Sequence, residues 1–115
     1  MTTSRVDMKL SVRDRQLAER AAAAIKRHVP DAEVILFGSR AAGTARPDSD
    51  FDFLVIADTA DRYQLMMELI PILEAVEGLT SFDVIVIPRQ DWARVRRMPS
   101  FVGWQADQYG VRINV

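Results

Sequence analysis

Two aspartates stand inside an otherwise apolar run, at residues 50 and 52 of the stretch DFDFLVIA. Side chains alternate across a strand, so Asp50 and Asp52 would share one face while Phe51 and Phe53 point to the other. Two carboxylates about 4 Å apart repel by roughly 4 kcal/mol at an effective dielectric near 20. A divalent cation would reverse that sign, and oxygen-only ligands favour a hard ion, Mg²⁺ or Mn²⁺. The pattern therefore predicts a metal site on a strand.

A third carboxylate follows in a similar setting. Asp83 opens the apolar run FDVIVIP, residues 82–88. If this strand lies beside the strand of residues 50–57, Asp83 joins the other two carboxylates.

A turn upstream supplies sites for an anion. Gly38 and Ser39 follow the apolar run EVILF, residues 33–37, at the start of a short helix expected over 39–42. Backbone N–H groups at a helix N-terminus favour a phosphate, Gly38 allows close approach, and the Ser39 hydroxyl can donate to it. Arg40 is a further candidate for contact with a phosphate, although an exposed structural arginine is an equal alternative. A phosphate site beside clustered carboxylates indicates metal-assisted transfer from a nucleoside triphosphate.

The order of strands and helices positions these groups. Alternating elements indicate an α+β protein, a two-layer α/β sandwich with a mixed sheet flanked by helices. Ser11 is the expected N-cap of the first helix, Pro71 is expected to kink or divide a helix, and Ser100 is expected to cap the last one. The expected helices cover residues 12–28, 39–42, 61–77, 91–97 and 100–109, and the expected strands cover 33–37, 50–57, 82–88 and 111–115.

Bulk composition narrows the class of protein. The 115 residues predict one domain over 1–115, and 49% hydrophobic residues can form a real core. A net charge of −1 gives no support for direct nucleic-acid binding through bulk charge. The chain has no cysteine, so disulfides are excluded, and no apolar segment approaches the roughly 20 residues that span a bilayer. A cytoplasmic location is the default expectation.

The stretch GSRAAGTARPDSDFDFLV carries a resemblance to a known family. Gly38-Ser39, ten intervening residues and then Asp50-Phe51-Asp52 resemble the signature of the DNA polymerase β-like nucleotidyltransferase superfamily, in its minimal nucleotidyltransferase branch. Asp83 matches the third carboxylate of that family. One departure is Ala42, where many relatives carry a basic residue.

The resemblance implies a role for each residue. Asp50, Asp52 and Asp83 would be catalytic and hold two Mg²⁺ ions, or Mn²⁺, against ATP. Asp83 would also help to deprotonate the attacking hydroxyl, and Gly38, Ser39 and Arg40 would bind the nucleotide. Because all three carboxylates are present, an active enzyme is favoured over a degenerate binding copy.

The resemblance also implies a partner. Proteins of this branch are commonly antitoxins of HEPN-type ribonuclease toxins, which they silence by adenylylating a tyrosine. The leading hypothesis is therefore an antitoxin that transfers AMP from ATP to its HEPN toxin within a hetero-oligomer. One alternative is a non-catalytic antitoxin that blocks the toxin by binding. Another is a transferase that acts on a small molecule or RNA with a partner subunit.

Overall fold

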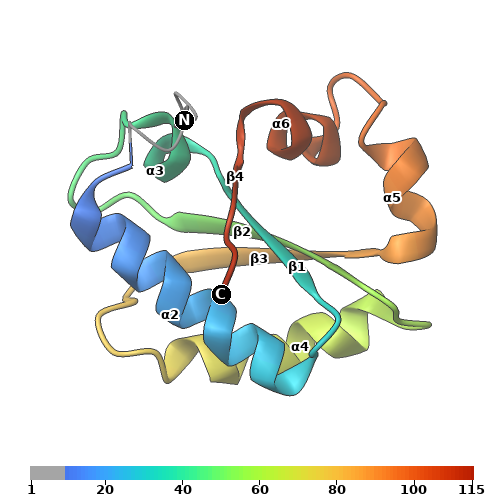
Figure 1. Cartoon of the computed structure of the whole chain (residues 1–115), viewed down its shortest axis with the longest axis horizontal. Coiled ribbons are helices and arrows are strands. Elements are labelled where there is room, and N and C mark those ends of the chain that lie inside the picture. The colour runs from blue at the N-terminus through green and yellow to red at the C-terminus, as the bar shows by residue number, and fades with distance from the viewer. Residues whose placement is uncertain (1–9) are drawn as a thin grey trace.

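A computed structural model describes residues 10–115, and its elements follow the predicted order (Figure 1). The first of the described helices, α2, is capped by Ser11, whose hydroxyl accepts from the N–H of Asp14 at 3.0 Å, as the sequence predicts. The helices are α2 (Val12–His28), α3 (Ser39–Ala42), α4 (Arg62–Glu74), α5 (Arg89–Val95) and α6 (Val102–Tyr109), and the strands are β1 (Glu33–Phe37), β2 (Phe51–Ala57), β3 (Phe82–Pro88) and β4 (Val111–Arg112).

The four strands form one mixed sheet in the order β3-β2-β1-β4. β1 runs antiparallel to β2 and β4, whereas β2 and β3 are parallel. A parallel pair needs a crossover connection, and α4 provides it. The predicted α+β architecture with a mixed sheet flanked by helices is confirmed.

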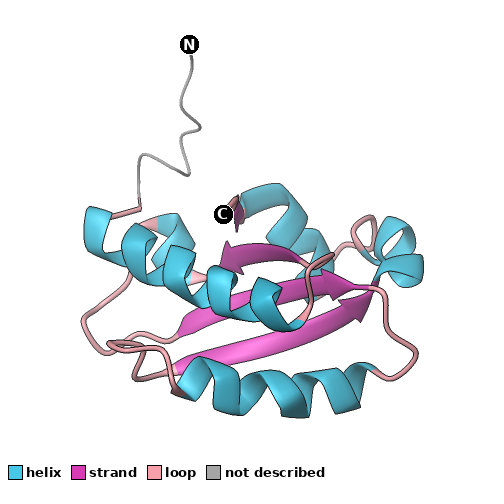
Figure 2. Cartoon of the chain, turned by 60° about the horizontal axis from the view of Figure 1, so that its bottom comes forward, coloured by secondary structure: helices cyan, strands magenta, loops and turns pink. Residues whose placement is uncertain are grey.

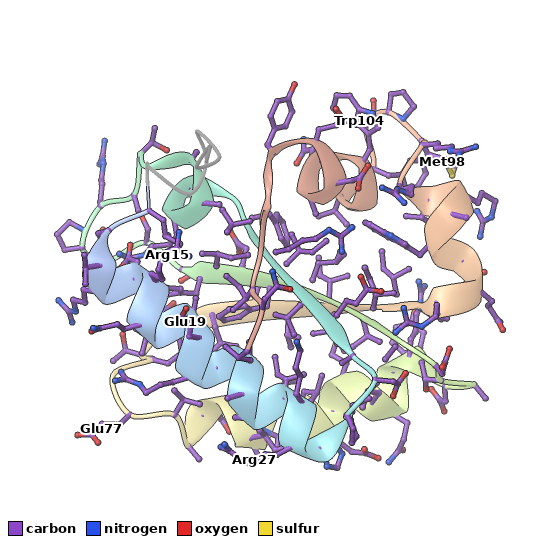
Figure 3. The ribbon with its side chains drawn as sticks, viewed as in Figure 1. Arg15, Glu19, Arg27, Glu77, Met98 and Trp104 are labelled. Atoms are coloured by element: carbon purple, nitrogen blue, oxygen red, sulfur yellow. The ribbon has the colours of Figure 1, made fainter. Side chains whose placement is uncertain are left out.

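Each face of the sheet has its own apolar core. On one face, α2 and α4 pack on alternate strand residues that include Phe51, Phe53 and Val84. On the other, α5 and α6 pack on the intervening residues, among them Leu54 and Ile56. Figure 2 shows α4 running beside β3 on the first face, and Figure 3 shows side chains filling the space between the layers.

Three local predictions are wrong. β2 begins at Phe51, so Asp50 precedes the strand instead of opening it. Pro71 does not divide α4, which is a single helix that ends at Glu74 with Pro71 in its last turn. Ser100 does not cap α6: Phe101 is the N-cap without a side-chain bond, and Ser100 adopts a positive φ of 76°.

Candidate active site

Asp52 and Asp83 lie side by side on the sheet. They are register partners in the parallel pair of β2 and β3, as the sequence argument required. Alternation places both side chains on the face of Leu54 and Ile56, opposite the buried ring of Phe53. The predicted separation of carboxylates from phenylalanines across β2 is therefore confirmed for Asp52.

Asp50 reaches this region from the loop before β2. It is exposed, and one of its carboxylate oxygens accepts a hydrogen bond from the hydroxyl of Ser81. The N–H of Phe51 donates to the carbonyl of Ser81 at 3.0 Å, so Ser81 secures both Asp50 and the residue after it. The sequence analysis did not identify Ser81. Its position directly before β3, two residues before Asp83, was the available signal.

Gly38 joins β1 to α3 directly against Asp52. Its φ of 77° lies in the left-handed region, and a Cβ atom there would stand 2.2 Å from Oδ2 of Asp52. Only glycine meets both the backbone conformation and the space. Ser39 follows as the first residue of α3, so the structure brings the Gly38-Ser39 turn next to Asp52.

Among the described residues, no cation is paired with these three carboxylates. The pKa of Asp52 is raised, first because burial disfavours its charged form and then because Asp83 and Asp50 repel it. None of the ion pairs between described residues includes Asp50, Asp52 or Asp83. Three hard oxygen donors with uncompensated charge have the chemistry that suits Mg²⁺ or Mn²⁺.

The side chains of the three aspartates do not converge as the ligands of one ion would. Within residues 10–115, no group of three or more His, Cys, Asp or Glu side chains is already arranged to hold a metal ion. Asp50 is turned toward Ser81, while Asp52 and Asp83 are neighbours on the strands. The assignment of all three as metal ligands stays a prediction.

Arg40 makes structural contacts instead of pointing into open space. Its guanidinium donates to the carbonyl of Ser49 at 2.8 Å and to that of Pro47 at 3.1 Å, and pairs with Asp14 of α2 at 3.3 Å. The same group lies over the ring of Phe51, 4.6 Å from its centroid. Arg40 thus fastens the residues on both sides of Asp50 to α2. Its predicted contact with nucleotide is untested, and sequence reasoning missed Asp14.

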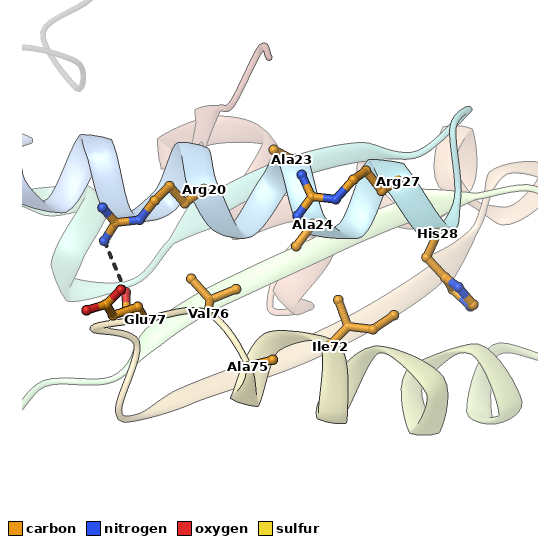
Figure 4. A pocket seen from close by; sticks show the side chains of 9 residues that line it. All are labelled: Arg20, Ala23, Ala24, Arg27, His28, Ile72, Ala75, Val76 and Glu77. Carbon is orange, nitrogen blue, oxygen red and sulfur yellow. Dashed lines mark hydrogen bonds between the residues drawn. The ribbon is translucent and has the colours of Figure 1, made fainter.

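A large hollow lies elsewhere in the described part of the chain. It measures about 700 Å³ and lies between α2 and the end of α4, lined by Arg20, Arg27 and His28 on one side and Ile72 and Val76 on the other (Figure 4). This groove is on the face of the sheet opposite Asp52 and Asp83. It is separate from the candidate site.

A comparison with protein families decides the assignment. The model of the nucleotidyltransferase domain family matches residues 18–101, which include Gly38, Ser39 and all three aspartates. The chain belongs to the nucleotidyltransferase domain family. Its carboxylates and its Gly-Ser turn therefore occupy a domain built for nucleotidyl transfer.

A solved structure supports the fold independently. A crystal structure of a candidate nucleotidyltransferase from Sulfolobus solfataricus superposes with a TM-score of 0.58 at 22% identity, covering 97% of this chain and 89% of that one. This likeness shows a shared fold. A search of curated proteins found no significant match. In the described part of the chain, no helix combines the length and apolar character needed to cross a membrane.

Proposed function

We propose that this nucleotidyltransferase-domain protein transfers AMP from ATP to a hydroxyl group of a partner protein, with Mg²⁺ as cofactor. The observation that carries the proposal is the register pairing of Asp52 with Asp83, directly beside the Gly38-Ser39 turn. Carboxylates for a cation and main-chain donors for a phosphate thereby stand next to each other. Metal-assisted phosphoryl chemistry needs both.

Each residue has a defined task in the reaction. Asp50, Asp52 and Asp83 would hold the metal, which when bound supplies positive charge against the triphosphate. Gly38 and Ser39 bind phosphate oxygens through the main chain and the Ser39 hydroxyl. Asp83 accepts the proton of the attacking hydroxyl. That oxygen bonds to the α-phosphorus, the bond from the α-phosphorus to the oxygen bridging to the β-phosphate breaks, and pyrophosphate leaves.

The acceptor hydroxyl is proposed to belong to another macromolecule, as in the minimal nucleotidyltransferases that the motif of Gly38-Ser39 and Asp50-Phe51-Asp52 resembles. By the resemblance to minimal nucleotidyltransferases, we propose that this macromolecule is a HEPN-type ribonuclease toxin, that the acceptor is a tyrosine, and that the chain acts as antitoxin in a hetero-oligomer.

The test is incubation with α-³²P-labelled ATP and Mg²⁺, alone and with the product of the neighbouring gene, followed by denaturing electrophoresis. Label on the neighbour, absent with an Asp52→Asn, Asp83→Asn double variant, is the expected result. If the double variant neutralises a toxic neighbour as well as the wild type does and no label appears, a binding-only antitoxin replaces the proposal. Label on RNA or on a small molecule without any protein acceptor would instead support the second alternative, a transferase that acts on a small molecule or RNA.

A further inference from the structure

Within residues 10–115, the strand that carries Asp83 has a free edge. β3 is the outermost strand on one side of the sheet, with β2 as its strand neighbour (Figure 2). Native proteins protect such edges with charges, prolines, bulges or covering segments, because an open edge pairs with other chains. Between Asp83 at its start and Pro88 at its end, β3 has only the apolar residues Val84–Ile87. The centre of this edge has no such charge or proline.

Alternation along the strand shows which main-chain groups of β3 point away from β2. The carbonyl of Ser81 accepts from Phe51 of β2, and main-chain groups alternate in direction along a strand. The N–H and C=O groups of Phe82, Val84 and Val86 therefore point away from β2. Pro88 falls in the same outward series, where its missing N–H costs no bond to β2, as is usual for an edge proline.

Two hollows flank this edge, one beside each end of β3, and together they are called the edge groove. Their lining includes residues at every fourth position of α4: Arg62, Met66, Ile70 and Glu74. The hollow beside the start of β3 measures about 550 Å³ and is lined by Met66, Ile70 and Glu74 together with Phe82–Val84. A second hollow of about 240 Å³ lies beside the end of β3, lined by Ile85 and Ile87 with Arg62 and residues of α5.

The two hollows open on opposite faces of β3. Val84 belongs to the core under α2 and α4, whereas Ile85 and Ile87 pack with the core under α5 and α6. A strand laid beside β3 would send alternate side chains to these two faces, and both faces have apolar hollows to receive them. A helix could not present side chains to both. The groove thus fits an extended chain.

We propose that the acceptor protein docks as an extended segment on the free edge of β3 and brings its hydroxyl-bearing side chain beside Asp83. This inference rests on the proposed transfer to protein. The segment residue in register with Asp83 shares its face, and Cβ atoms of such neighbours stand about 5 Å apart. The residues directly before and after this residue in the segment point to the other face, against Met66 and Ile70, so they must be apolar.

The charged residues along the groove determine which charges a complementary segment has at its two ends. Two acidic residues lie at the active-site end, Glu74 in the hollow and Asp83 with its side chain on the opposite face of β3, and no cationic residue lines this hollow. The hollow at the far end is lined by Arg62 and Arg94 with a single carboxylate, Asp91. A complementary segment has a basic residue near its acceptor hydroxyl and an acidic residue at its opposite end.

The test uses a synthetic twelve-residue peptide that has one tyrosine flanked by valines, a lysine near the tyrosine and a glutamate at the far end. NMR-detected amide exchange of the full-length protein is the readout, because it does not depend on catalysis. With saturating peptide, the amides of Phe82, Val84 and Val86 should exchange at least about tenfold more slowly. A peptide N-methylated on every edge-facing amide should lose this effect, whereas methylation of the alternate amides should preserve it.

Two adjacent methionines provide matched variants. Met66 lines the groove, whereas Met67 is 63% exposed on α4 and does not line it. Met66→Lys should weaken peptide binding at least about tenfold and Met67→Lys should leave it unchanged, with thermal unfolding measured for both to exclude misfolding. Equal effects of the two substitutions would contradict docking along the groove.

The outcomes separate docking from transfer. Slowed exchange without nucleotide transfer to the peptide supports the docking mode and counts against the proposed transfer reaction. Transfer to the peptide without slowed exchange at Phe82, Val84 and Val86 overturns the docking mode alone. In the free protein, these amides could instead exchange more slowly as the protein concentration rises. That result would show that two copies pair through β3, and it would also overturn the proposal.

Discussion

Asp52 and Gly38 are in such close contact that a methyl group on Gly38 would stand 2.2 Å from Oδ2 of Asp52. This contact joins the end of β1 to the start of β2 and brings the turn that could hold phosphate against a carboxylate that could hold metal.

Gly38→Ala should reduce nucleotidyl transfer by at least about 100-fold and destabilise the fold by about 1–3 kcal/mol, because a φ of 77° is strained for alanine and Asp52 must move. Initial rates and urea unfolding measure the two effects. Gly43→Ala is the matched control, since Gly43 has the same φ of 77° but ends α3. It should cost about 1 kcal/mol without the large loss of rate, and equal losses of rate would contradict a specific role for the Gly38–Asp52 contact.

Arg40 leads to a prediction about the loop before Asp50. Arg40→Lys keeps the charge but cannot reproduce the bonds to Ser49 and Pro47, the pair with Asp14 and the planar contact with Phe51 together. We expect a loss of about 1–3 kcal/mol in the free energy of unfolding and faster amide exchange over residues 43–50. Arg46→Lys, in the same loop at an exposed position, should change neither quantity. An unaltered loop in Arg40→Lys would show that these contacts do not order it.

How much of this could be read from the sequence depends on the range of the interaction. Strand alternation is local, so the separation of Asp52 from Phe51 and Phe53 was predictable. The pairing of Asp52 with Asp83 was also within reach, because a helix between two apolar runs indicates a parallel crossover. These two inferences account for most of the candidate site.

What the sequence did not reveal depends on tertiary contacts. The ion pair of Arg40 with Asp14 spans 26 positions, and the bond between Ser81 and Asp50 spans 31. Neither spacing has a local signature. The continuity of α4 through Pro71 also lacks a local signature, since proline usually kinks or breaks a helix. The position of β3 at the sheet edge likewise follows from the order of all four strands.

Asp52 should make stability depend on pH in an unusual direction. Its pKa is raised in the folded state by burial and by Asp83 and Asp50, so the folded protein holds the proton more tightly than the unfolded chain does. Stability contributed by the protonated form is present below the ordinary pKa of 3.8 and is lost as the pH rises through the raised value. At pH 7 the ionised carboxylate therefore destabilises the fold.

Asp52→Asn should accordingly raise the free energy of unfolding at pH 7 by about 0.5–1 kcal/mol while it abolishes transfer. Thermal unfolding at a series of pH values measures the difference, which should shrink to zero as the pH approaches 3. Asp48→Asn, an exposed aspartate in the preceding loop, is the control and should show no such difference. If Asp52→Asn were less stable than the wild type at pH 7, the ionised carboxylate of Asp52 would not destabilise the fold.

Ligand binding should reverse the same destabilisation. If a divalent cation offsets the charges of Asp50, Asp52 and Asp83, Mg²⁺ with ATP should stabilise the wild type by about 2.7 kcal/mol at 100 times the dissociation constant. ATP with a chelator should stabilise it much less, since the triphosphate then adds negative charge beside these carboxylates.

An Asp52→Asn, Asp83→Asn variant should lose most of the effect of Mg²⁺ with ATP. Arg27→Ala, in the groove between α2 and α4, should keep all of it, because that groove lies on the opposite face. Loss of the effect in Arg27→Ala and its survival in the double variant would relocate the nucleotide to the groove.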